Sequence, residues 1–339
     1  MSIKKVLAVV FSTLFIVIAV YSIYLTGYEK PPVDPSWAVE GNKDIPEGAV
    51  TVRWTGTSTL VISDGSSTII TDGWFSRPGL GDALLNNISP DMEAITFGLQ
   101  KNQITNADAV FAFHSHYDHA MDAPEVAKRT GATLMGSPST AMIAKGWGLS
   151  DNQITVVEDR QSYPVGAFTL TPIITYHAPT PTEGGKVNKD YEKITAPLVP
   201  PVAILDYRVG ASYTLHIEHP KGDIMITGSA GYRQDALQGF NADYYLLGIG
   251  GFGGFEPAYQ NIFWDQTIGL TQPHTVIPIH WDSLTGPIEG EFTGMMRLFS
   301  MIIGGSDNPD MIPTFFNNKA KEQGIKLITL PRYDEVVLF

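Results

Sequence analysis

Residues 107–119 read ADAVFAFHSHYDH and join a short apolar run to a cluster of potential metal ligands. The run ADAVFAF is typical of a buried strand. The cluster has the form H-x-H-x-D-H, and its four potential ligands are His114, His116, Asp118 and His119. Side chains two positions apart in an extended segment point the same way, so the first two histidines can bind one ion, while the following turn directs the other two ligands to a neighbouring point. We therefore expect a cation site here, and the alternative is a polar loop whose histidines only form hydrogen bonds.

The segments around this cluster predict sheets covered by helices. Three strand-like runs separated by turn signals precede the cluster and predict an antiparallel meander, at 49–56, 58–65 and 66–73. After the cluster, strands alternate with helices expected near 123–130 and 138–146. Further strand-like runs follow at 154–159, 167–178, 202–230 and 325–339. This order predicts a mixed α/β domain.

The composition excludes several classes of protein and ligand. The chain has 339 residues, with 22 Lys and Arg against 35 Asp and Glu, which gives a formal net charge of −13. Nucleic-acid binding is not expected, because phosphate recognition needs clustered basic residues. The chain contains no cysteine, so disulfides, thiolate metal sites and a cysteine nucleophile are excluded. Any metal must be held by histidines and carboxylates.

The N-terminal segment is expected to anchor the chain in a membrane. Residues 6–25 carry no charge and have about the length of a membrane-spanning helix. Lys4 and Lys5 precede them, and under the positive-inside rule this pair places residues 30–339 on the non-cytoplasmic side. A cleaved signal peptide, which would leave a secreted or periplasmic protein, is the alternative. The expected division is an anchor, a linker and one domain, over 1–27, 28–48 and 49–339.

The chain resembles the metallo-β-lactamase fold hydrolases over residues 49–339, and more narrowly the branch of ascorbate-lactonase-like enzymes and the N-acylphosphatidylethanolamine phospholipase D type. The segment STLVISDGSSTIITDGWFSRPG resembles the family's opening strands, with Asp72 in the place of the acid that steadies the metal loop. His177 in ITYHAPT resembles the third histidine of the first metal site, and His280 in VIPIHWD resembles the late histidine of the second. The resemblance implies an αββα sandwich.

The resemblance also implies two ligand sets, one of three histidines and one with a carboxylate. They are His114, His116 and His177 for one ion, and Asp118, His119 and His280 for the other. The family's bridging aspartate is expected in IMITGSAGYR, where Ser229 stands instead. A serine hydroxyl cannot supply the bridging charge, so the second ion should bind more weakly, and a single-metal enzyme becomes an option. Zinc is expected for donors rich in imidazole, at one or two ions per chain, while iron and manganese suit the same donors.

The function implied by this site is metal-dependent hydrolysis. A bound metal lowers the pKa of a water ligand, and the resulting hydroxide attacks a carbonyl or phosphoryl centre. Asp118 is the expected catalytic carboxylate, which ligates or orients that water. The expected substrate is an ester, lactone, amide or phosphodiester of a small or lipid-like molecule. The alternatives are a mononuclear-iron enzyme of oxygen or redox chemistry, and a domain that binds a metal or a partner without catalysis.

A few other features are interpreted as lying outside the metal site. His216 and His219 are three residues apart, which in a strand points them to opposite faces. The glycines of 248–253 favour a close-packed loop over a dinucleotide site. Residues 177–201 are either a substrate lid or a surface insertion.

Overall fold

The computed structural model describes residues 3–179, 192–303 and 308–339, with side chains from residue 11 onward except those of 302–303. Two seven-stranded sheets dominate these residues. The first sheet contains, in spatial order, β16 (Val336–Val337), β1 (Thr51–Gly56), β2 (Thr59–Ser63), β3 (Thr68–Thr71), β5 (Ala109–Phe111), β6 (Thr133–Gly136) and β7 (Ile154–Val156). The second contains β15 (Lys326–Leu327), β14 (Thr275–Ile279), β13 (Tyr244–Gly248), β12 (Gly222–Thr227), β11 (Ser212–His219), β9 (Phe168–Thr175) and β8 (Tyr163–Val165). A short pair, β4 (Asn87–Ile88) and β10 (Val202–Ala203), lies apart from both.

The strand pairing follows the order predicted from the sequence. In the first sheet β1, β2 and β3 form an antiparallel meander, and β3, β5, β6 and β7 then pair in parallel. In the second sheet β8, β9, β11 and β12 are antiparallel, while β12, β13, β14 and β15 are parallel. Parallel strands need crossover connections, and helices lie in most of them here, whereas the connection from β12 to β13 consists of turns.

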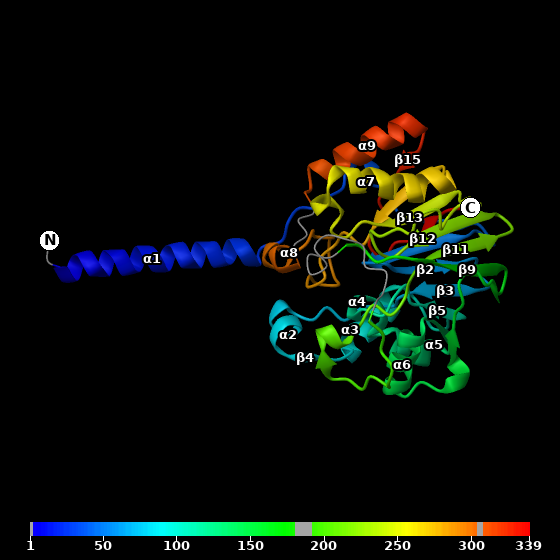
Figure 1. Cartoon of the computed structure of the whole chain (residues 1–339), viewed down its shortest axis with the longest axis horizontal. Coiled ribbons are helices and arrows are strands. Elements are labelled where there is room, and N and C mark those ends of the chain that lie inside the picture. Colours follow the sequence, from blue (N-terminus) through cyan, green and yellow to red (C-terminus); the bar gives the residue numbers. More distant parts are fainter. Residues whose placement is uncertain (1–2, 180–191, 304–307) are drawn as a thin grey trace.

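Helices cover the outer face of each sheet (Figure 1). Those of the first half are α2 (Leu80–Leu85), α3 (Met92–Lys101), α4 (Tyr117–Ala120), α5 (Ala123–Thr130) and α6 (Pro138–Trp147). The helices of the second half are α7 (Pro257–Trp264), α8 (Arg297–Ile303) and α9 (Met311–Gln323), of which α8 lies beside the end of α1. Short helical turns occur at Pro35–Trp37, Asp151–Gln153, Ile204–Asp206, Phe252–Gly254 and Asp265–Gly269.

The main core lies between the two sheets. Apolar side chains of both sheets, among them Trp54, Phe111 and Leu215, are fully buried in one cluster. A second cluster packs α3 and α5 against the first sheet, where Ile95 and Val126 are buried. On the other side Phe316 of α9 is buried against Trp264, with ring centroids 5.3 Å apart. The layers are therefore helix, sheet, sheet, helix, and the expected αββα sandwich is confirmed.

The N-terminal helix α1 (Ile3–Thr26) projects from the rest of the molecule (Figure 1). Crossing a bilayer takes about 20 consecutive apolar residues in one helix. No helix in the part of the chain that the structure describes is long and apolar enough for this, and the described side chains of α1 begin only at residue 11. The predicted membrane anchor, with its domain on the non-cytoplasmic side or released by cleavage, is therefore wrong on this finding.

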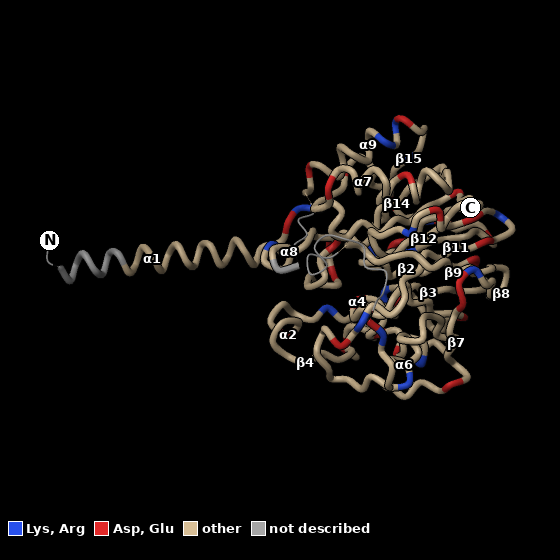
Figure 2. The backbone as a smooth tube through the Cα atoms, viewed as in Figure 1, with Lys and Arg blue, Asp and Glu red and all other residues tan. Residues whose placement is uncertain are grey.

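Charged residues of both signs are interspersed over the two layers (Figure 2). The described residues of α1, 11–26, carry no charge. Residues expected as a linker contribute to the core, because Trp37 is buried against Phe316 and its indole N–H donates to Asn317 at 3.0 Å. The packed part of the protein therefore includes residues of the expected linker, as Trp37 shows.

Candidate metal centre

The H-x-H-x-D-H cluster lies where β5 ends and α4 begins. Ser115, between the first two histidines, fixes this loop from behind. Its backbone N–H donates to Val209 at 3.0 Å, and its hydroxyl lies 3.0 Å from that of Ser137 and 3.1 Å from that of Thr140. These buried contacts fix the backbone between His114 and His116.

Three histidines form the first group of potential ligands. His114 Nε2 lies 3.1 Å from His116 Nδ1, and each pair of the three rings, including that of His177, has centroids 4.8 Å apart. His177 follows β9 in the second sheet, and its Nδ1 donates to the carbonyl oxygen of Ala178 at 2.8 Å. A neutral imidazole that donates through Nδ1 keeps its lone pair on Nε2. In this group, one ring nitrogen of each histidine lies within 4.8 Å of a ring nitrogen of each of the other two.

The second group adds a carboxylate to two further histidines. Asp118 Oδ2 lies 3.4 Å from His119 Nε2 and 3.3 Å from His280 Nε2, and the two Nε2 atoms are 3.1 Å apart. His280 follows β14, so this group also takes ligands from both sheets. His114 belongs to the first group, yet its ring centroid lies only 3.7 Å from that of His119, so the two groups adjoin.

Asp72 orients His119 from the side away from the site. Its Oδ2 lies 2.7 Å from His119 Nδ1 and accepts from the Ser58 hydroxyl at 2.5 Å, while its Oδ1 accepts from the backbone N–H of Phe113 at 3.0 Å. A carboxylate behind a histidine fixes the ring and makes it a stronger ligand. Asp72 itself has a φ of 54°, an uncommon backbone conformation that these contacts hold in place.

The protonation of the first group suits a cation. Burial, together with the neighbouring imidazoles, lowers the pKa of His116 to about 3 and that of His177 to about 4. Burial and the same neighbours also hold the pKa of His114 well below its usual range. Three adjacent neutral imidazoles offer three lone pairs and no positive charge. This is the donor set that a divalent ion such as zinc takes up.

The second group carries charge of both signs. Burial would lower the pKa of His119, but the carboxylates of Asp72 and Asp118 outweigh it and raise that pKa to about 10. Burial would likewise raise the pKa of Asp118, but His119 and His280 hold it well below its usual range. Without a metal, His119 therefore keeps a proton at neutral pH, and an ion entering this group must displace it.

Ser229 lies beside the turn that carries the third histidine of the first group. It is buried, and its hydroxyl accepts a hydrogen bond from the backbone N–H of Ala178 at 3.0 Å. Ser229 thus fixes the turn that carries His177. Within the described residues, Asp118 is the one carboxylate that either group of potential ligands contains.

The remaining sequence candidates lie elsewhere in the fold. His216 and His219 are on β11 and belong to neither ligand group: His216 Nε2 lies 3.1 Å from the carbonyl oxygen of Asn241, and His219 Nε2 lies 3.6 Å from Asp64. Of the segment 177–201, which was expected as a lid or an insertion, residues 180–191 lie outside the described part of the chain. Two further residues, Arg77 and Asp282, form a buried ion pair near His280 that sequence reasoning did not assign. The position of Asp282, two residues after a ligand, was the available signal.

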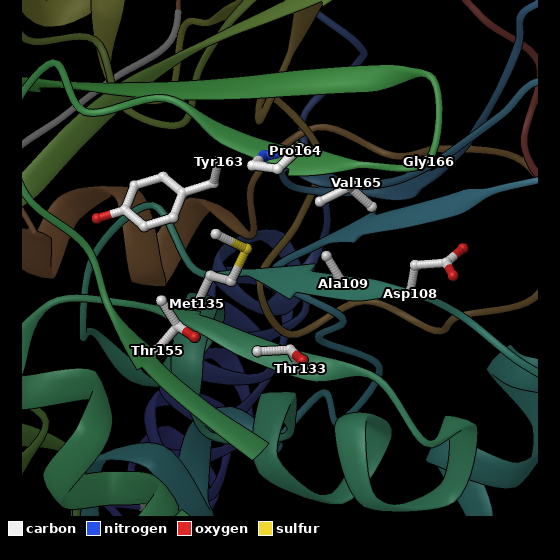
Figure 3. Close-up of a pocket in the computed structure, with 9 residues that line it drawn as sticks. All are labelled: Asp108, Ala109, Thr133, Met135, Thr155, Tyr163, Pro164, Val165 and Gly166. Carbon is white, nitrogen blue, oxygen red and sulfur yellow. The ribbon is translucent and has the colours of Figure 1, made fainter. Parts of the chain in front are cut away.

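A pocket of about 370 Å³ lies at the other end of β5 (Figure 3). It is lined by Asp108, just before this strand, by Met135 of β6 and by Tyr163 of β8. Because the metal cluster follows the opposite end of β5, this pocket is separate from the candidate metal centre.

An imidazole and carboxylate site at the strand ends of an αββα sandwich is the arrangement of metal-dependent enzymes of the metallo-β-lactamase fold. The chain belongs to the metallo-β-lactamase superfamily, because residues 51–280 match the family described as the beta-lactamase superfamily domain. It is also 22% identical over 235 residues to a UPF0173 metal-dependent hydrolase of Pyrobaculum islandicum, which covers 68% of this chain and 84% of that protein.

Two solved structures share the fold. Igni18, a metallo hydrolase from Ignicoccus hospitalis, matches with a TM-score of 0.51 at 16% identity, over 86% of this chain and 99% of that chain. CmlA, a diiron beta-hydroxylase from Streptomyces venezuelae, matches with a TM-score of 0.53 at 11% identity, over 87% of this chain and 55% of that chain. At these identities the likeness concerns the fold alone.

Proposed function

We propose that this hydrolase cleaves an ester, lactone, amide or phosphodiester bond of a small or lipid-like molecule at the two ligand groups described above. The convergence of six ligand atoms carries the proposal, because the atoms of each group lie within 4.8 Å of one another. The relative from Pyrobaculum islandicum is described as a metal-dependent hydrolase, which supports the reaction class. The breadth of the substrate class reflects the range of bonds that one activated water can attack.

The first group is proposed as the tightly bound zinc site. His114, His116 and His177 supply three neutral imidazoles and leave the fourth tetrahedral position open, as in catalytic zinc sites. When bound, the ion lowers the pKa of a water molecule toward neutrality and polarises the scissile group. The hydrogen bond from His177 Nδ1 to Ala178 fixes the tautomer that this role requires.

Asp118 is proposed as the catalytic carboxylate. It is buried and stays ionised at neutral pH, because His119 and His280 hold its pKa well below the usual range. An ionised carboxylate can only accept hydrogen bonds. It is therefore suited to accept one from the attacking water and so to orient it toward the substrate.

The second group is proposed to bind an ion more weakly. Asp118, His119 and His280 supply a single carboxylate, and Ser229 supplies no charge where a bridging aspartate would stand. Two dications in adjacent groups repel each other when no bridging anion offsets their charges. We expect one firmly held ion per chain, with a second that is lost on dialysis.

Elemental analysis of the purified protein, combined with hydrolysis assays, tests the proposal. Zinc near one equivalent, together with metal-dependent cleavage in a panel of esters, lactones, amides and phosphodiesters, is the expected result. Iron with oxygen consumption would instead select oxygen chemistry. Full metal loading without hydrolysis of any substrate in the panel would select a binding domain.

A further inference from the structure

Arg77 and Asp282 form an ion pair that is almost fully buried beside the second ligand group. Arg77 Nη1 lies 3.3 Å from Asp282 Oδ2, and their side chains are 5% and 3% exposed. Arg77 follows β3 in the first sheet, while Asp282 lies two residues beyond His280 at the end of β14 in the second. The pair therefore joins the two layers beside the second ligand group.

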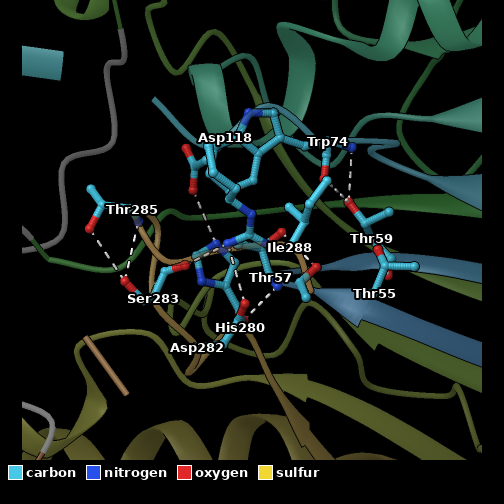
Figure 4. A network of polar contacts seen from close by, with 12 residues as sticks. Thr55, Thr57, Thr59, Trp74, Asp118, His280, Asp282, Ser283, Thr285 and Ile288 are labelled. Atoms are coloured by element: carbon cyan, nitrogen blue, oxygen red, sulfur yellow. Dashed lines mark hydrogen bonds and ion pairs between the residues drawn. The ribbon is translucent and has the colours of Figure 1, made fainter. Parts of the chain in front are cut away.

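The other contacts of this pair lead directly to the ligand His280. Asp282 Oδ1 accepts from the backbone N–H of Thr57 at 2.6 Å (Figure 4). The carbonyl oxygen of the same Thr57 accepts from the backbone N–H of His280 at 2.9 Å. Arg77 Nη1 also donates to the carbonyl oxygen of Ser283 at 2.6 Å. We call these four residues, Arg77, Asp282, Thr57 and Ser283, the clamp.

The backbone that the clamp holds is strained. Thr57 has a φ of 48° and His280 a φ of 58°, both in the left-handed region that residues other than glycine seldom adopt. Gly56 allows the close approach: a Cβ at this position would lie 2.3 Å from Arg77 Nη2 and 2.6 Å from Asp282 Oδ2. Such conformations persist only where surrounding contacts over-determine them. The clamp provides those contacts.

Stability alone is a poor reason for this pair. Removing two charges from water costs free energy, and well-packed apolar residues are often as stable in their place. A second ion pair, between Arg53 and Glu335, is more exposed, at 17% and 21%, and its partners contact Asn102 and Thr51, not a metal-ligand loop. The buried pair differs in that it fixes the backbone of His280.

We propose that Arg77 and Asp282 are positioning residues, which hold His280 so that its imidazole faces Asp118 and His119 and completes the second metal site. The proposal rests on the ligand set given under the proposed function. Both carboxylate oxygens of Asp282 already have partners: Oδ1 accepts from the backbone N–H of Thr57, and Oδ2 pairs with Arg77. This carboxylate is therefore not a substitute for the missing bridging aspartate. The clamp is proposed to strengthen ion binding at the second group by holding His280 in place.

Titration of the metal-free full-length protein with Co²⁺ tests this, with the absorption spectrum of each bound equivalent as the readout. Asp282→Ala is expected to weaken the second equivalent by roughly 10- to 100-fold, as loss of a partner behind a metal ligand does, and to leave the first within about threefold. Arg77→Met is expected to act in the same direction. Both residues act through one ion pair, so their effects should not add. The double variant should bind the second Co²⁺ equivalent about as well as the single variant with the larger loss.

Two further variants separate positioning from general stability. Arg77→Lys keeps the charge but replaces the planar guanidinium, whose Nη1 contacts both Asp282 and Ser283, so a smaller loss at the second equivalent is expected. This variant decides the test should Asp282→Ala not fold. Glu335→Gln breaks the control ion pair and is expected to lower the unfolding midpoint without changing either Co²⁺ equivalent.

Three results would overturn the proposal: equal weakening of both equivalents, no change in the second, or a wild type that takes up no second ion at any Co²⁺ concentration. The proposed function is judged separately, by hydrolysis with the first ion bound. If the wild type binds two Co²⁺ ions but hydrolyses no substrate, the proposed hydrolytic function is refuted, while the Co²⁺ titrations still test the role of the clamp.

Discussion

Individual side chains decide which ions this protein can hold. Among the described residues, the group that contains His116 has only two other ligands, His114 and His177. Replacing His116 by alanine leaves two ligands, which cannot hold a tetrahedral ion with an open position. His116→Ala is therefore expected to lose bound metal and hydrolysis together, as measured by elemental analysis and activity of the same sample.

The control for this variant is His216→Ala. His216 is buried on β11 and contacts the carbonyl oxygen of Asn241, far along the strand from the ligand groups, so metal content should stay at the wild-type level. Loss of metal from His216→Ala with retention in His177→Ala would show that the third ligand is wrongly assigned.

Ser229 is proposed to occupy the position of the bridging aspartate that the family resemblance implies. Ser229→Asp restores a carboxylate, whose oxygen can still accept from the N–H of Ala178. Retained metal is expected to rise from near one ion per chain toward two, measured after identical dialysis of both proteins. The rate of hydrolysis need not rise, since one ion already activates water. Two firmly bound ions in the wild type would contradict this prediction.

The residues of the site differ in how far the sequence revealed them. The spacing of His114 to His119 follows from strand geometry, and His177 and His280 came from the family resemblance. The sequence does not show that Asp282 contacts Thr57, more than 200 residues away. Side-chain pairs at such separation depend on how the two sheets dock, which local patterns do not encode.

At the scale of elements, the Asp122 carboxylate, just before α5, connects this helix to the loop after β3 by hydrogen bonds. Its Oδ2 accepts from the backbone N–H groups of Phe75 and Ser76 at 2.8 and 2.6 Å, and its Oδ1 accepts from the Ser76 hydroxyl at 2.8 Å. Asp122→Ala leaves these buried donors without an acceptor. We expect the free energy of unfolding at pH 7 to fall by about 1–3 kcal/mol, measured by urea denaturation of the metal-free protein.

The same carboxyl predicts a pH dependence. The pKa of Asp122 is raised to about 6, because the effect of burial outweighs the opposite effect of the hydrogen bonds from Ser76 and Phe75. Between about pH 4 and pH 6 the folded state therefore binds more protons than the unfolded state, and stability falls as pH rises through this window. The difference in unfolding free energy between wild type and Asp122→Ala should be larger at pH 5 than at pH 7. A difference that grows with pH would contradict the assignment.

The order of elements was predictable because it rests on local patterns. Alternating apolar residues and turn signals indicated β1 to β3, and the change to alternating strands and helices indicated the parallel part of the first sheet. The N-terminal run of apolar residues was the exception. It indicated a helix, and α1 is one, but the inference of a membrane span did not hold for the described residues.

At the scale of the whole molecule, α1 is nearly independent of the sandwich. Phe15 and Ile23 are 73% and 72% exposed, and the helix contacts the domain at its end, where the Arg297 guanidinium lies 4.6 Å from the centre of the Tyr24 ring. Deleting residues 1–26 should leave metal content unchanged and shift the melting temperature by less than about 4 °C.

Size-exclusion chromatography with light scattering provides a second measurement for this deletion. The full-length chain is expected to self-associate more than the shortened one, because α1 exposes contiguous apolar surface. Loss of bound metal from the shortened chain would instead show that contacts near Tyr24 support the loop after His280.

Each group of ligands draws on both sheets: His114 and His119 follow β5 in the first, while His177 and His280 follow β9 and β14 in the second. Neither site can exist until the two layers have come together, since unfolded chains rarely hold preformed metal sites. An ion is therefore expected to enter late in refolding, after most secondary structure has formed. The Co²⁺ absorption that develops when a metal-free chain is refolded with the ion present should then lag behind the recovery of circular dichroism, and so time the final docking of one half of the protein on the other.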